Sequence, residues 1–173
     1  MKSLLLVLFI ACSAIISPTA TAALADVEIK VVRQKLDQGV SRRDGDTRVV
    51  TKEIIYNVTI QSKTFKTLEN LEVRYMVFYY DSEFGSRERP TEHSRSGSEK
   101  IAVLQGNKSV DFQTKSITLT SESLDGNVIW ANGASSTSKD RVSGVWVRAF
   151  NSAGAVIGEY ASPSSITKRD WKD

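Results

Sequence analysis

The stretch LEVRYMVFYY, residues 71–80, decides the fold class of this chain. Its odd-numbered positions are all apolar: Leu71, Val73, Tyr75, Val77 and Tyr79. Its even-numbered positions begin as polar and end as apolar: Glu72, Arg74, Met76, Phe78 and Tyr80. A period of two is typical of a β-strand, because successive side chains point to opposite faces. The pattern predicts a strand that buries one face along its whole length and both faces at its far end.

The doubly apolar end of this strand has two explanations. In the first, it is the end of a central strand that lies beneath a loop, since large apolar side chains are usually packed. In the second, it is an exposed aromatic patch that binds a partner. The first explanation is favoured.

Shorter apolar runs on both sides predict further strands. Before residues 71–80 they occupy 27–31 and 54–61, the second extending back toward Val49, with the turn signal Asp44-Gly45 between them. After it they occupy 101–104, one or two segments within 110–119, and the pair 145–150 and 155–160. The four residues 151–154 that separate this last pair are a loop length typical of β-hairpins.

Two polar stretches interrupt the strands. Residues 81–99 are predicted to form a long connection, and residues 121–143 an irregular segment with an apolar island at 128–130. No window of a dozen residues keeps a helical period of 3.6. The sequence therefore predicts an all-β fold: a single antiparallel, immunoglobulin-like β-sandwich of about seven or eight strands over residues 26–173.

Two segments carry a resemblance to a known family. VRAFNSAG at 147–154 resembles the late hairpin of fibronectin type III domains, and LEVRYMV at 71–77 resembles their central strand. Ser143 stands where that family has a corner tyrosine, and the chain is about half as long again as such a domain. The resemblance implies an immunoglobulin-like sandwich in the broad sense, and a fold of this kind does not by itself convey a function.

The N-terminus has the layout of a secretory signal. Lys2 is followed by an apolar run over residues 4–16 and then by small residues. The apolar run of about 13 residues is shorter than the roughly 20 that cross a bilayer. We predict cleavage between Ala25 and Asp26, and export to the periplasm or the extracellular space.

Cys12 is the only cysteine of the 173 residues, and it lies within this signal. The residues before it form a poor lipoprotein box, so a lipid anchor at Cys12 is the less favoured alternative to free secretion. Otherwise we expect contact with the membrane only through the signal. After cleavage the chain has no cysteine, which excludes disulfides and thiolate metal ligands.

The charges of the chain are balanced. The 23 basic residues include Lys2, and the 20 acidic residues all follow the signal, so the net charge after cleavage is about +2. Nucleic acid binding calls for a clustered basic face, so we do not expect a nucleic acid partner.

Reactive groups are sparse. His93 is the only histidine, and no nucleophile motif or ligand cluster accompanies it. Four carboxylates at 81, 83, 88 and 92 lie among arginines, which is typical of a solvated charged loop. We expect no enzyme, no cofactor and no metal. A secreted hydrolase that uses these loop carboxylates is kept as an alternative.

The candidate binding residues are Tyr80, Phe84, Trp146 and Arg148. Trp146, Arg148 and Phe150 alternate with three smaller apolar residues, and the arginine in their midst predicts that the Trp146 face is the partly exposed one. Exposed aromatic and arginine side chains are common in protein-binding and sugar-binding surfaces. The sequence thus favours an exported, non-enzymatic binding or accessory module whose partner is a protein or a glycan. A structural subunit of a surface or periplasmic assembly is the second alternative.

Overall fold

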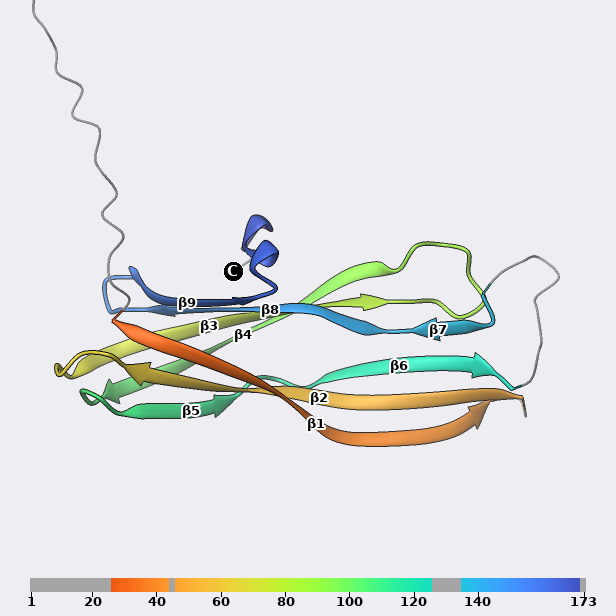
Figure 1. Cartoon of the computed structure of the whole chain (residues 1–173), viewed down its shortest axis with the longest axis horizontal. Coiled ribbons are helices and arrows are strands. Elements are labelled where there is room, and N and C mark those ends of the chain that lie inside the picture. The colour runs from red at the N-terminus through yellow and green to blue at the C-terminus, as the bar shows by residue number, and fades with distance from the viewer. Residues whose placement is uncertain (1–25, 44–45, 126–134, 172–173) are drawn as a thin grey trace, which may run out of the picture.

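A computed structural model describes residues 26–43, 46–125 and 135–171. The described residues form an elongated sandwich of two antiparallel sheets (Figure 1). The predicted signal with its cleavage site after Ala25, the turn at Asp44-Gly45 and the apolar island at 128–130 lie outside the described residues.

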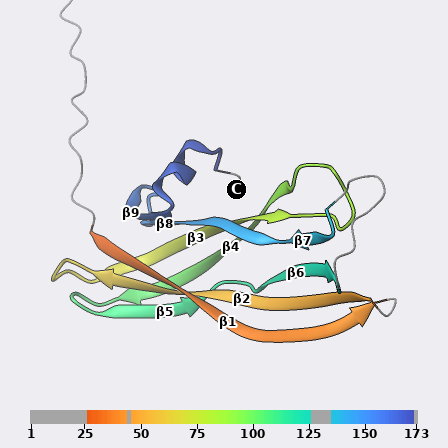
Figure 2. The same cartoon turned by 45° about the vertical axis from the view of Figure 1, so that its right-hand side comes forward.

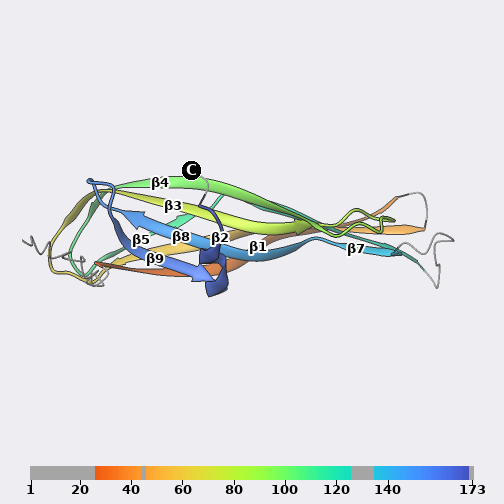
Figure 3. The same ribbon diagram turned by 90° about the horizontal axis from the view of Figure 1, so that it is seen from above.

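Nine strands are present in the described part of the chain. They are β1 (Val27–Arg43), β2 (Thr47–Ser62), β3 (Leu68–Asp81), β4 (Thr91–Leu104), β5 (Ser109–Gln113), β6 (Ile117–Leu124), β7 (Thr137–Lys139), β8 (Arg141–Phe150) and β9 (Val156–Ser162). One sheet has the order β1-β2-β6-β7, with β5 also paired to β2, and the other has the order β4-β3-β8-β9. Seen from above, the strands of the second sheet lie side by side across the molecule (Figure 3).

The core is built on β3, as its sequence predicts. Leu71, Val73, Tyr75 and Val77 are all buried on one face of this strand, at 4% exposure or less. They pack in one cluster with β2 residues such as Val58 and Ile60 and β8 residues such as Val147. Burial of this face stabilises the sandwich, since each Å² of apolar surface removed from water contributes about 25 cal/mol.

The opposite face of β3 is covered at one end only. Met76 and Phe78 are buried there in a second cluster with Trp146 and Ile166, and Trp171 packs against it. Ile166 belongs to a short 3₁₀ helix, η1 (Ser164–Lys168), which folds back over the sheet (Figures 1 and 2). The doubly apolar end of β3 is thus a covered central strand, and its cover is the C-terminal segment.

The prediction of a long connection over residues 81–99 is wrong in part. Residues 91–99 belong to β4, and the connection shrinks to residues 82–90. Among the described strands β4 pairs with β3 alone and is an edge strand. Nearly all its residues before Ile101 are exposed, so its sequence lacks the alternation that marks a half-buried strand.

Edge position also explains the other differences from the predicted strands. β1 continues to Arg43, well past Val31, and its outer part is exposed on both faces. β7 is a three-residue polar strand within the stretch expected to be irregular, and it raises the count above the seven or eight predicted. The 110–119 segment does form two strands, and the β8–β9 hairpin lies where its loop length predicts it.

Candidate binding face

The face of the β4-β3-β8-β9 sheet that points away from the core is called the outer face here. Strand register places Arg74 of β3 between Ser98 of β4 and Arg148 of β8. One step along, Glu72 lies between Lys100 and Phe150. Where the C-terminal segment does not cover it, this face is therefore a polar and charged surface.

Two open cavities meet on the outer face. One of about 580 Å³ runs from β3 and β4 to the β8–β9 loop, and its lining includes Asn70, Lys100, Phe150 and Asn151. The other, of about 500 Å³, runs from β4 to the C-terminal segment. Its lining includes Ser96, Ser98, Lys115 and Trp171. Both cavities are lined by Glu72 and Arg74, so together they form one depression, the Arg74 groove.

Arg74 is held in place at the centre of this groove. Its Nη2 donates to Glu72 Oε2 at 3.0 Å, and both side chains are about one-third exposed. The guanidinium also lies over the Phe150 ring, 4.9 Å from its centroid. A cation that is already fixed by an ion pair and an aromatic face loses little conformational freedom when a partner binds.

Trp146 is buried, contrary to the exposure predicted for its face. It is 2% exposed, because the C-terminal segment brings the Trp171 ring edge-on to it at 4.8 Å. The Arg148 guanidinium lies over both indole rings, at 4.2 and 4.8 Å. Trp146 anchors the C-terminal segment and offers no open ring to a ligand, whereas Arg148 stays partly exposed at 27%.

A carboxylate completes the contacts around Trp146. Glu159 Oε1 accepts hydrogen bonds from Trp146 Nε1 at 2.9 Å and from Arg148 Nε at 2.7 Å. Burial of this carboxyl works to raise its pKa, but the two hydrogen bonds and the charge of Arg148 outweigh burial. The pKa of Glu159 therefore lies below its ordinary value. The ionised carboxylate accepts the hydrogen bond that fixes the Trp146 indole.

The remaining two predicted site residues lie away from the groove. Tyr80 is half-buried near the end of β3, with the Arg141 guanidinium 5.2 Å from its ring centroid. Phe84 is half-buried in the 82–90 connection. Arg74, Glu72 and Phe150, which shape the groove, were not among the candidates. The polar pair Glu72 and Arg74 opposite a continuous apolar face was the signal that could have found them.

Two of the four carboxylates considered for hydrolysis, Asp81 and Glu92, lie on strands and contact other side chains. Glu92 Oε1 pairs with Arg169 Nη1 at 2.5 Å and accepts a hydrogen bond from Ser143 Oγ at 3.0 Å. His93 stacks on Tyr79 with the ring centroids 5.6 Å apart, and its Nε2 is 4.0 Å from Asp81 Oδ2. Within the described ranges, no group of three or more His, Cys, Asp or Glu side chains could hold a metal ion.

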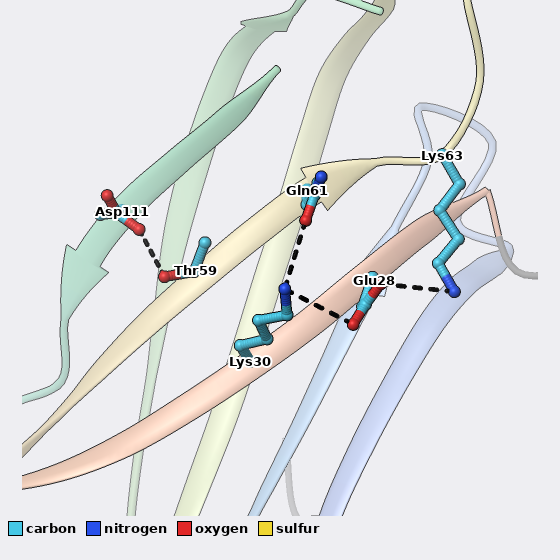
Figure 4. Close-up of polar contacts among 6 residues, drawn as sticks. All are labelled: Glu28, Lys30, Thr59, Gln61, Lys63 and Asp111. Atoms are coloured by element: carbon cyan, nitrogen blue, oxygen red, sulfur yellow. Dashed lines mark hydrogen bonds and ion pairs between the residues drawn. The ribbon is translucent and has the colours of Figure 1, made fainter. Parts of the chain in front are cut away.

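The outside of the other sheet carries a balanced charge network instead of a groove (Figure 4). Lys30 Nζ lies 3.8 Å from Glu28 Oε1 and 3.5 Å from Gln61 Oε1, and Lys63 Nζ lies 3.5 Å from Glu28 Oε2. Nearby, Thr59 Oγ1 donates to Asp111 Oδ1. Exposed ion pairs of this kind contribute about 1 kcal/mol or less, and they leave little net charge for a ligand.

The described residues contain no helix with the length and apolar character that a membrane span requires.

No protein-family model matches the chain, and no curated protein matches its sequence. Several solved structures are similar to it, and three of them follow. The X-ray structure of Northeast Structural Genomics Consortium target SoR45 has 12% identity and a TM-score of 0.39, covering 87% of this chain and 98% of that one. The E. coli curli protein CsgC has 10% identity and a TM-score of 0.30, covering 79% and 99%. A Bordetella pertussis protein, target BeR40, has 10% identity and a TM-score of 0.34, covering 79% and 91%. At these scores the likenesses carry no argument about function.

Proposed function

We propose that this chain is an exported, non-enzymatic binding module that holds a protein partner in the Arg74 groove. The observation that carries the proposal is the meeting of two cavities at a preorganised arginine. Binding energy in protein interfaces concentrates on a few central arginine and aromatic side chains. Arg74, Phe150 and Trp171 supply such a set around one depression.

A protein fits this groove better than a glycan. A sugar ring stacks on an open aromatic face, but Phe150 has Arg74 over its ring and Trp171 has Arg148 over its ring. Beside the groove, β4 is an edge strand among the described strands, and two of its exposed side chains there, Ser96 and Ser98, are small. An extended polypeptide can add to such an edge through its backbone while its side chains enter the groove.

Two further inferences belong to the same proposal. The sandwich is immunoglobulin-like in connectivity. This is supported by β1-β2-β6 in one sheet and β4-β3-β8-β9 in the other, with the chain crossing between the sheets after β2, after β4 and before β8. The chain is exported, which is supported by the charge, apolar run and small residues of positions 1–25.

A structural role is the alternative that one specific observation favours. Val32, Leu36 and Val40 are 63%, 48% and 57% exposed, and all three lie on the edge strand β1. Exposed apolar side chains along an unpaired edge favour association with another chain. In that case the protein self-associates in solution, and Val40→Lys makes it monomeric.

Site-specific photo-cross-linking in cells that produce the protein tests the binding proposal. A cross-linking amino acid at Ser98 lies beside the groove, and one at Thr118, exposed on the other sheet, is the matched control. We expect a discrete protein adduct from position 98 and none from position 118. Equal adducts from both positions, or a protease-resistant adduct that glycosidase removes, would contradict a protein partner in the groove.

A further inference from the structure

A second charged surface lies on the β1-β2-β6-β7 sheet, near the end where β1 and β2 are joined. Register places residues of β2, β6 and β7 in two adjacent rows on one face: Arg48, Ser123 and Thr137, and Val50, Ser121 and Lys139. Lys52 follows two positions after Val50 on the same face. Together with Gln38 of β1, Glu122 and Ser138 they line an open cavity of about 430 Å³, called the distal patch here.

The three cations of the distal patch surround a hydroxyl. Arg48 and Lys52 are four residues apart on β2, or about 13 Å along the strand. Lys139 lies two strands away from β2, about 10 Å across the sheet, level with the point midway between them. Ser121 of β6 lies between Val50 and Lys139 in this row. Three long cationic side chains can therefore approach one group placed over Ser121.

Three of the carboxylates nearby are engaged with other groups. Glu122, whose side chain is 10% exposed, pairs with Arg43 at 3.2 Å, and Asp125 pairs with Arg42 at 3.1 Å. Asp140 accepts backbone hydrogen bonds from Ser82 and Thr120 at 3.0 and 2.8 Å. None of these three acids forms an ion pair with Arg48, Lys52 or Lys139.

By contrast, the side chains of Arg48, Lys52 and Lys139 make no hydrogen bond or ion pair with any described residue. Lys52 is also half-buried. A charge that is partly withdrawn from water and has no partner costs free energy, and a bound anion removes that cost.

We propose that the distal patch binds an oxyanion of the phosphate or sulfate type. Arg48 can donate two parallel hydrogen bonds to such a group, and Lys52 and Lys139 add point charges. The hydroxyls of Ser121, Ser123 and Thr137 are donors for the remaining oxygens. This site lies on the other sheet from the Arg74 groove and does not depend on the function proposed for it.

Titration of the purified protein with inorganic phosphate tests the site, with backbone amide NMR shifts as the readout. We expect saturable shifts centred on residues 121–123 and 137–139. Arg48→Gln and Lys52→Gln should each weaken binding about tenfold. Lys66→Gln is the control, because Lys66 is exposed in the β2–β3 connection, at the opposite end of β2. Circular dichroism confirms that each variant is folded.

Two results would overturn the proposal. One is a linear, unsaturated response to phosphate, and the other is an equal loss of affinity in Lys66→Gln and Lys52→Gln. Vesicles of phosphatidylglycerol and phosphatidylcholine distinguish the sources of the oxyanion. Binding to these vesicles that inorganic phosphate displaces, and that Lys52→Gln weakens, identifies a lipid headgroup. Phosphate binding without vesicle binding identifies a soluble oxyanion.

Discussion

The ring of Tyr75 occupies the space that any side chain at Gly97 would need. The two residues lie directly opposite each other on β3 and β4. A Cβ on Gly97 would come well under 3.0 Å from the hydroxyl end of the tyrosine. The same hydroxyl accepts a hydrogen bond from the backbone N–H of Lys115 at 2.9 Å. Lys115 lies between β5 and β6, so Tyr75 links β3 to the opposite sheet while its ring lies against Gly97 of β4.

Gly97→Ala is therefore expected to destabilise the protein. The tyrosine must shift away from the new methyl group, and its hydrogen bond to Lys115 is strained or lost. Overpacking of this kind costs about 1–3 kcal/mol, measured as a lower midpoint in urea unfolding. Gly39→Ala on β1 is the matched control, because nothing lies within 4 Å of a Cβ there. Equal midpoints for the two variants would show that Tyr75 does not constrain position 97.

The C-terminal segment is expected to contribute to stability through Ile166. This side chain is 1% exposed and packs with Met76, Phe78 and Trp146. Ile166→Ala leaves a cavity beneath η1 and should cost about 2–5 kcal/mol of unfolding free energy. Ser165→Ala, at an exposed neighbour, should cost little. Equal unfolding free energies for the two variants would show that packing of Ile166 does not stabilise the fold.

Glu159 gives the stability a pH dependence with a defined sign. Its pKa is lower in the folded chain than the ordinary value of 4.5. Its contribution is therefore fully present above about pH 4.5 and is lost as the pH falls through the folded pKa. We expect Glu159→Gln to be less stable than wild type at pH 7, and the difference in unfolding free energy to shrink toward pH 3.

A constant difference between the two proteins from pH 7 to pH 3 would contradict this role of Glu159. Glu99→Gln is the control for a general charge effect, because Glu99 is exposed on β4. Its unfolding free energy should follow that of wild type over the whole range.

The part of the fold that could be predicted from the sequence is the part with a contrast between its two faces. Leu71 and its alternating partners mark β3 because one face meets the core and the other begins as polar. The 91–99 segment of β4 gives no such signal, since both its faces meet water. The glycine at position 97 is explained by the Tyr75 ring, which belongs to β3 and leaves no space for a side chain there.

The candidate site was predicted less well, for a related physical reason. An arginine between Trp146 and Phe150 is typical of a solvent-exposed face, and Arg148 is indeed partly exposed. Trp146 is nevertheless buried, because residues 164–171 fold back over it. That segment is polar apart from Ile166 and Trp171, and its docking depends on contacts with β3 and β8 that no local pattern encodes. The groove at Arg74 likewise forms only when β4 and the β8–β9 loop flank β3.

The most direct test of the binding role of the Arg74 groove is the dissociation constant of the partner captured at position 98, measured for Arg74→Ala. We expect affinity to fall about 30-fold, the effect of losing about 2 kcal/mol at a central arginine. Arg87→Ala, at an exposed arginine in the 82–90 connection, should bind as tightly as wild type. Unchanged affinity in folded Arg74→Ala, or an equal loss in both variants, would contradict a partner held in the Arg74 groove.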